Sequence, residues 1–247
     1  VNPEFIPQFK EVLAKYDLKL VGINQHIGSL FMDGKPYVEG VKAILNIAKQ
    51  FDDLEFVDLG GGFGIPYEKL NDQPRLDMVE LGKQLDEVFE QFVKDYGKEI
   101  TFKIEPGRYV SAECGVLLGT VTAVKHNGED KYIGTDIGFN VLQRPVMYDS
   151  HHDIEVYNDS DNTEDVTVVG NICESGDILA KHRICPEMHV GDTMAMLDAG
   201  AYGYCMASNY NNRLRPAEVL IRENGEAVLV RERDELEDLT RHMKSIK

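Results

Sequence analysis

Apolar positions in the first hundred residues alternate between two spacings. Apolar side chains recur every three or four residues in three ranges, and this spacing predicts amphipathic helices at 9–16, 38–48 and 81–96. Each predicted helix is followed by a short apolar run, and these runs predict buried strands at 18–23, 54–59 and 100–104. Three alternations of helix and strand predict parallel strands connected by crossover helices.

The pattern changes after about residue 113, where the helical spacing ends. Short β-rich runs bounded by Gly, Asn and Asp predict an antiparallel all-β domain, with strands at 115–125, 131–136, 164–170, 193–198, 217–222 and 227–231. Residues 235–243 predict a short C-terminal helix, and the acidic residues of 153–165 predict a solvated loop. The chain is therefore predicted to combine an α/β domain at 1–113 with an antiparallel β-domain at 114–247.

The composition of the 247 residues excludes several classes of protein. There are 43 Asp and Glu against 26 Lys and Arg, which gives a formal net charge of −17. So acidic a surface repels phosphate backbones and anionic lipids, and we expect neither nucleic-acid nor membrane binding. No apolar run approaches the roughly 20 residues that cross a bilayer. The four cysteines include no C-x-x-C pair, which fits a reducing compartment and predicts a cytoplasmic protein.

Polar or glycine-rich segments follow each of the three predicted parallel strands, at the edge where such sheets bind ligands. They carry His26 with Ser29, the glycines of 60–64, and Glu105 with Arg108. The glycine run lacks the G-K-[ST] of a Walker loop and has Tyr67 where a dinucleotide fingerprint needs its third glycine. Its amides predict either an anion pocket or only a tight turn. A lone histidine and a surface ion pair are the ordinary alternatives at the other two ends.

The β-rich half carries three further polar groups. Arg144 and Tyr148 precede the pair His151 and His152, whose adjacent side chains diverge, so we expect no metal site there. Cys173 followed by Glu174 is either a reactive pair or a turn with a buried thiol, and no partner supports a cysteine protease. Tyr202 lies in a glycine-rich segment that is otherwise an ordinary strand end.

Together and in this order, seven segments resemble the group IV pyridoxal-phosphate decarboxylases, which combine an alanine-racemase-like barrel with a β-domain. The segments are His26-Ile-Gly-Ser29, Gly60-Gly-Gly-Phe-Gly64, Glu105-Pro-Gly-Arg108, Arg144-Pro-Val-Met-Tyr148, Ile172-Cys-Glu-Ser-Gly-Asp, Gly200-Ala-Tyr202 and Ser208-Asn-Tyr-Asn-Asn-Arg-Leu-Arg-Pro. The resemblance spans nearly the whole chain. It implies that pyridoxal 5'-phosphate is the cofactor and that meso-2,6-diaminopimelate is decarboxylated to L-lysine and CO2.

The resemblance also implies which residues bind the cofactor. The histidine stacks on the cofactor ring, the serine, the glycines and a tyrosine hold the phosphate, and the glutamate faces the pyridine nitrogen. The glutamate keeps that nitrogen protonated, which favours decarboxylation over racemisation. The cofactor-binding residues implied here are His26, Ser29, Gly60, Gly61, Gly62, Glu105, Gly107, Arg108 and Tyr202.

A diamino-diacid substrate needs cations for its distal carboxylate and an anion for its distal ammonium. By resemblance, Arg108, Arg144 and Tyr148 bind the carboxylate and Glu174 binds the ammonium, with Tyr202 also at the substrate. Cys173 is the implied catalytic acid. In the family the cysteine and the glutamate reach the neighbouring subunit's site, so the resemblance implies a homodimer with shared active sites.

Three strands cannot close a barrel, and the family's Schiff-base lysine lies in a segment that precedes everything matched here. We therefore expect residues 1–113 to be the C-terminal half of a (β/α)8 TIM-like barrel, with the N-terminal barrel half as a missing partner. The chain alone is expected to be inactive. Two alternatives remain open: a decarboxylase of another basic or carboxylated amino acid, and a non-catalytic regulatory homologue.

Overall fold

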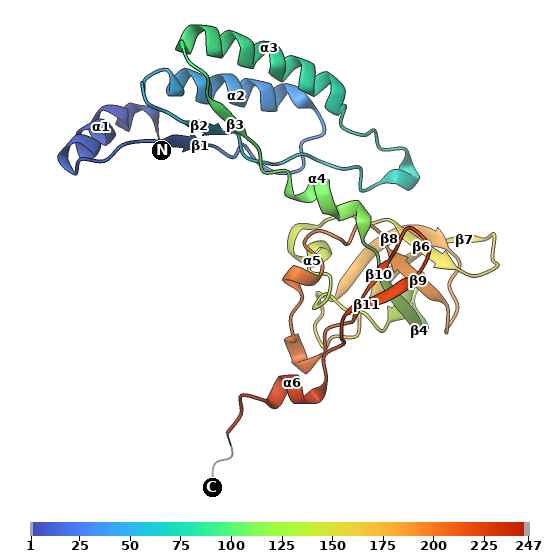
Figure 1. The fold of residues 1–247 in the computed structure, drawn as a ribbon. Coiled ribbons are helices and arrows are strands. Elements are labelled where there is room, and N and C mark those ends of the chain that lie inside the picture. The colour runs from blue at the N-terminus through green and yellow to red at the C-terminus, as the bar shows by residue number, and fades with distance from the viewer. Residues whose placement is uncertain (1, 245–247) are drawn as a thin grey trace. The chain divides into compact units, whose positions relative to one another are not determined.

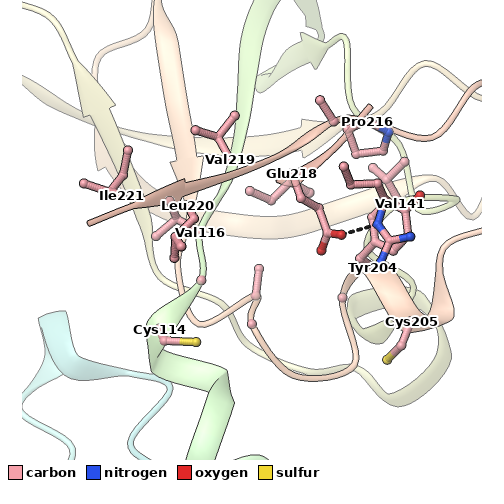
Figure 2. A pocket seen from close by; sticks show the side chains of 17 residues that line it. Cys114, Val116, Val141, Tyr204, Cys205, Pro216, Glu218, Val219, Leu220 and Ile221 are labelled. Atoms are coloured by element: carbon pink, nitrogen blue, oxygen red, sulfur yellow. Dashed lines mark hydrogen bonds and ion pairs between the residues drawn. The ribbon is translucent and has the colours of Figure 1, made fainter. Parts of the chain in front are cut away.

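The computed structural model describes residues 2–244, which form two units (Figure 1). The first unit holds the residues up to Pro66 together with Gln73–Val110. The second holds Tyr67–Asp72 and the residues from Ser111 onward. The contact boundary at 110/111 lies near the predicted domain boundary at 113/114, but residues 67–72 group with the second unit and not with the first.

The first unit contains a parallel three-stranded sheet in the order β1 (Gly22–Asn24), β2 (Phe56–Asp58) and β3 (Thr101–Lys103). Three helices alternate with the strands along the chain: α1 (Ile6–Lys15), α2 (Gly34–Ala48) and α3 (Met78–Tyr96). The α/β alternation predicted from apolar spacing is therefore confirmed. The 3-10 helix η1 (Pro3–Phe5) precedes α1, and α4 (Gly107–Ser111) follows β3.

The helices α2 and α3 both begin at an aspartate that caps the helix. Asp33 accepts a hydrogen bond from the Lys35 amide at the start of α2, and Asp77 accepts from Val79 and Glu80 at the start of α3. The helix α3 ends at Tyr96 and is followed by Gly97, whose left-handed backbone caps it. The two helices lie side by side (Figure 1) and bury an apolar core against the sheet: Tyr37, Val41, Leu45, Leu54, Val57, Leu59 and Phe92. This core fixes the ends of the three strands.

The second unit is built on a six-stranded sheet with strand order β6-β9-β4-β5-β7-β8. Its strands are β4 (Leu117–Asn127), β5 (Asp130–Thr135), β6 (Ile154–Tyr157), β7 (Thr163–Val169), β8 (Ile178–Pro186) and β9 (Thr193–Met196). A separate antiparallel pair joins β10 (Glu218–Ile221) to β11 (Ala227–Arg231). The short helices are η2 (Lys69–Asn71), η3 (Ala112–Cys114), α5 (Arg144–Tyr148), η4 (Tyr204–Met206), η5 (Tyr210–Asn212) and α6 (Leu236–Thr240).

Two predictions for this unit need correction. The sheet is mixed and not purely antiparallel, because β5 and β7 pair in parallel. Residues 153–165 form a loop only at 158–162, because β6 pairs with β9, β7 begins at Thr163 and Asp153 is buried. Within β6, Ile154 and Val156 turn inward while Glu155 and Tyr157 are exposed, so the strand has the period of a half-buried sheet edge. The predicted order, an α/β unit followed by a β-rich unit, is confirmed.

The longest helix of the described chain, α3, is amphipathic. Among residues 2–244, no helix is both long enough and apolar enough to span a bilayer.

Candidate functional site

The carboxyl ends of the three parallel strands are hydrogen-bonded to one another through the glycine run. The Gly61 amide donates to His26 Nδ1 over 3.4 Å, and the Glu105 amide donates to the Gly60 carbonyl over 3.0 Å. The Gly60 amide donates to Asp58 Oδ1, which pins the start of the run to the end of β2. The structure therefore brings together three sequence-predicted groups, which we call the glycine-run cluster: His26, Ser29, Gly60, Gly61, Gly62 and Glu105.

Glycine is required in this run because the backbone of other segments approaches it closely. A Cβ on Gly61 would lie 2.0 Å from the Glu105 carbonyl oxygen. At Gly62, φ is +102° and a Cβ would lie 2.2 Å from the Gly28 carbonyl oxygen. The run is thus a tight turn, and this does not exclude an anion site. The Gly62 amide donates no hydrogen bond to any group within residues 2–244, so it remains available to a ligand.

The remaining groups of the cluster suit a phosphorylated pyridine. His26 and Ser29 are exposed beside the glycine run, and the Glu105 carboxylate is exposed and accepts no hydrogen bond in the described part of the chain. An available amide and a hydroxyl match a phosphate, and a carboxylate matches a protonated ring nitrogen. The helix α4 begins with Gly107 and Arg108, directly after Glu105-Pro106 begins the turn, and the Gly107 amide donates to the Glu105 carbonyl over 2.9 Å. The residues present therefore fit pyridoxal phosphate.

Arg144 begins α5, where Pro145 occupies a position that favours a helix start. Its side chain is buried, with 2% of the residue exposed. Nη1 lies 2.8 Å from His152 Nε2, and Nη2 donates to Ser150 Oγ over 3.3 Å. The guanidinium carbon lies 4.4 Å from the centroid of the Tyr67 ring. These contacts fix the orientation of the predicted carboxylate-binding cation.

Tyr148 follows Arg144 by four residues, at the end of α5, and is exposed. The two residues lie about one helical turn apart, with the Arg144 guanidinium buried and Tyr148 exposed.

Cys173 and Glu174 lie in the loop between β7 and β8. Cys173 is exposed, so the alternative of a buried thiol is wrong. Glu174 Oε2 accepts a hydrogen bond from the Tyr210 hydroxyl over 3.3 Å. The loop is organised by Asp177, whose two carboxylate oxygens each accept a 2.7 Å hydrogen bond, one from the Phe139 amide and one from the Ile172 amide. Burial raises the pKa of Asp177.

Tyr202 lies in the turn after β9 and has a left-handed backbone, with φ of +58°. Asp198, in the same turn, is 3% exposed and pairs with Lys69, which also lies 3.2 Å from Glu113. The Leu70 amide donates to Asp153 Oδ2 over 3.1 Å. These contacts hold the segment Tyr67–Asp72 within the second unit. They thereby place the Tyr67 ring against Arg144.

The sequence-predicted residues divide between the two units. The glycine-run cluster, Gly107 and Arg108 belong to the first unit. The second unit holds Arg144, Tyr148, Cys173, Glu174 and Tyr202. Reasoning from sequence assigned no role in the site to Tyr67, His152, Asp177 and Tyr210, although each contacts a predicted site residue or its loop. Among residues 2–244, no three His, Cys, Asp or Glu side chains are grouped so as to hold a metal ion.

Comparison with known proteins shows the protein family to which this chain belongs. The family model described as "Pyridoxal-dependent decarboxylase, C-terminal sheet domain" matches residues 20–200, and the chain belongs to this family. The resemblance inferred from the sequence is thereby confirmed, and pyridoxal phosphate is the cofactor of the family.

Individual relatives and solved structures show how similar the chain is to proteins of this family. The chain is 41% identical over 243 residues to a diaminopimelate decarboxylase of Methanothermobacter thermautotrophicus, covering 95% of this chain and 56% of that protein. It is 42% identical over 226 residues to that of Archaeoglobus fulgidus, covering 88% and 53%. The crystal structure of diaminopimelate decarboxylase from Methanocaldococcus jannaschii aligns with a TM-score of 0.87 at 33% identity, covering 96% and 56%. The chain spans about half the length of the curated relatives it matches.

Proposed function

We propose that this chain is the C-terminal portion of a pyridoxal-phosphate-dependent decarboxylase that converts meso-2,6-diaminopimelate to L-lysine and CO2. The observation that carries the proposal is the glycine-run cluster, in which an available amide, an exposed histidine and an exposed carboxylate meet at the ends of three parallel strands. The identity to diaminopimelate decarboxylases over nearly the whole chain supports the choice of substrate.

Within this proposal the first unit holds the cofactor. The run Gly60–Gly62 binds the phosphate through its available Gly62 amide, the Ser29 hydroxyl also binds the phosphate, and His26 covers one face of the ring. When bound, pyridoxal phosphate supplies an electron sink for the pair released as CO2 departs. The Glu105 carboxylate keeps a proton on the ring nitrogen and thereby strengthens that sink. Gly107 and Arg108 complete the turn that presents the carboxylate.

The second unit supplies the groups that recognise and complete the reaction. The Arg144 guanidinium and the Tyr148 hydroxyl bind the distal carboxylate of the substrate, together with the Arg108 guanidinium of the first unit. Glu174 binds the distal ammonium, and Cys173 delivers the proton that replaces CO2. Tyr202 contributes its hydroxyl to the phosphate and lies beside the substrate. The buried position of Arg144 strengthens its attraction for a carboxylate, because less water screens the pair.

The proposal includes the assembly around the chain. Residues 1–113 form the C-terminal half of a (β/α)8 barrel, and residues 114–247 form a β-domain of Greek-key type. The Schiff-base lysine lies in the barrel half that this chain does not span, so the chain is inactive without that half. Cys173 and Glu174 act in the site of a second subunit, which makes the enzyme a homodimer.

The test uses the enzyme completed with the rest of the barrel. Release of CO2 and formation of L-lysine from meso-diaminopimelate are measured for the wild type and for Glu105→Gln and Arg144→Met. We expect Glu105→Gln to lower kcat by about 100-fold or more, since it removes the proton at the ring nitrogen, and Arg144→Met to raise KM chiefly. Activity on lysine or ornithine instead would support a different substrate, and cofactor binding without any turnover would support a regulatory homologue.

A further inference from the structure

The adjacent histidines at 151 and 152 have no role in the reaction described above, yet His152 is one of the most buried polar residues of the second unit. It is 1% exposed. Its Nδ1 lies 2.6 Å from the Leu197 carbonyl oxygen, and its Nε2 lies 2.8 Å from Nη1 of Arg144. Both ring nitrogens are therefore engaged, one by the backbone and one by the cation proposed to bind substrate.

The chemistry of these two partners determines the state of the ring. A guanidinium has only donors, so Nε2 must accept a hydrogen bond from Arg144. A carbonyl oxygen has only lone pairs, so Nδ1 must carry the proton and donate it to Leu197. His152 is thus the neutral tautomer with its proton on Nδ1. Only in this form can the ring connect the two groups.

The carbonyl that selects the tautomer is itself held in place. Leu197 directly follows β9, and its amide donates to the Asp153 carbonyl over 2.9 Å. The neighbouring carbonyl, that of His152, accepts a hydrogen bond from Arg183 over 3.0 Å. The backbone on both sides of the ring is therefore fixed, and the direction of the Nε2 lone pair is fixed with it.

A second aromatic ring restrains the same guanidinium. The Tyr67 ring lies 5.3 Å from the His152 ring at 74°, an edge-to-face arrangement, and the Arg144 guanidinium lies over the Tyr67 face. The cation is held in its plane by the histidine and on its face by the tyrosine. Arginine has several rotatable bonds, and this arrangement removes much of their freedom before substrate arrives.

We propose that His152 is a positioning residue, which orients the Arg144 guanidinium toward the distal carboxylate of the substrate through the Nδ1-protonated tautomer that Leu197 selects. This inference rests on the proposed function, since it takes Arg144 as the carboxylate-binding group. A histidine that merely fills space in the second unit would have no requirement for an acceptor at Nε2.

Two variants separate the functions of the two ring nitrogens in the completed enzyme. In His152→Asn, the amide nitrogen lies near the position of Nδ1 and still donates to Leu197, but the side chain offers Arg144 no acceptor. Gln places an amide oxygen near Nε2 and keeps the acceptor for Arg144. We expect His152→Asn to raise KM for meso-diaminopimelate about tenfold with little change in kcat, as loss of a hydrogen bond to a charged group implies, and His152→Gln to restore most of it. His189→Gln, at a side chain 62% exposed, is the control.

The outcomes separate this inference from the proposed function. Equal KM effects of Asn and Gln, or no effect of either, would overturn the positioning role while leaving the wild-type activity intact. A wild type that releases no CO2 from meso-diaminopimelate would overturn the proposed function and the substrate role of His152 with it.

A second measurement does not depend on turnover or on the stability of a variant. Nitrogen-15 spectra of histidine-labelled wild-type protein at neutral pH report which ring nitrogen carries the proton, and the variants assign the His152 signals. We expect the proton on Nδ1, and a proton on Nε2 would refute the proposed connection to Arg144.

Discussion

Replacing Gly61 by alanine tests the close approach on which the glycine-run cluster depends. A Cβ at this position would lie 2.0 Å from the Glu105 carbonyl oxygen, and real Cβ contacts are essentially never under 3.0 Å. The backbone after β3 must therefore move by about 1 Å, which strains the Glu105–Gly60 hydrogen bond. Overpacking of this kind costs about 1–3 kcal/mol, and we expect Gly61→Ala to lower the free energy of unfolding by about 2 kcal/mol.

Gly82 provides a matched control in the same unit. It lies in the middle of α3, and a Cβ there would meet no atom within 4 Å. Gly82→Ala should therefore raise the free energy of unfolding by about 0.5–1 kcal/mol, because alanine has the higher helix propensity. The same substitution is thus expected to have opposite signs at two positions of one unit.

Urea denaturation followed by far-UV circular dichroism measures both variants. The helices α1, α2 and α3 all belong to the first unit, and the helices of the second unit are shorter, so the helical signal reports the unit that carries the substitutions. The transition midpoint should shift down for Gly61→Ala and up for Gly82→Ala with a similar slope. If Gly61→Ala unfolds at the wild-type midpoint, the strand ends do not approach as described and the cluster built on them is wrong.

Three further predictions follow from buried groups. Asp177→Asn keeps only one acceptor for two amides, so it should slow turnover of the completed enzyme through the Cys173 loop and lower the melting temperature; an unchanged kcat would refute its organising role. Burial, with the charge of Asp58 adding to it, raises the pKa of Tyr37 to about 12, so stability present below pH 10 should be lost as pH rises toward 12. At pH 11 the wild type should lose about 1 kcal/mol more than Tyr37→Phe, each compared with its own value at pH 8, and parallel losses in urea melts would contradict this. Burial raises the pKa of Cys185 to about 11, so iodoacetamide at pH 8 should modify it last of the four cysteines by peptide mass mapping; early labelling would mean an open second unit.

The first unit was largely predictable because its signals are local. The spacing of apolar residues along α2 and α3 defines one buried face each, and the strands between them are short apolar runs with glycine or polar residues at their ends. The glycine run could be located from sequence, but its two interpretations could not be separated. The structure shows the tight turn through the positive φ of Gly62 and the close approach of the Gly28 backbone, and the anion pocket stays a prediction.

The second unit was less predictable because its pairings join distant residues. The parallel contact of β5 with β7 leaves no mark in the sequence of either strand. At 153–165 the acidic composition concealed the alternation of Ile154 and Val156, and it also concealed the burial of Asp153. A charged side chain within such a run normally indicates solvent.

The contacts around the candidate site could not be predicted from the sequence either. Tyr67 was noticed only as the residue that breaks a dinucleotide fingerprint, yet its ring packs on Arg144 across 77 positions of the sequence. Asp177 and Tyr210 lie in segments that resemble the family, but their contacts could not be predicted, because residue spacing does not identify partners that are backbone amides or the Glu174 carboxylate. Family resemblance names the residues that carry chemistry, whereas the residues that orient them emerge from three-dimensional contacts.

The six residues of Tyr67–Asp72 limit how recombination can exchange the two units. They belong to the second unit although the chain on both sides of them belongs to the first, so no single cut in the gene separates the units. A recombination event at the 113/114 boundary would deliver a β-domain whose buried Asp198 lacks Lys69 and whose Arg144 lacks the Tyr67 ring. Exchange with a relative that has no cation at position 69 would leave an uncompensated buried charge at Asp198. We therefore expect the two units to be inherited as one piece. The residues of 67–72 and the residues that they contact in the second unit should then change together.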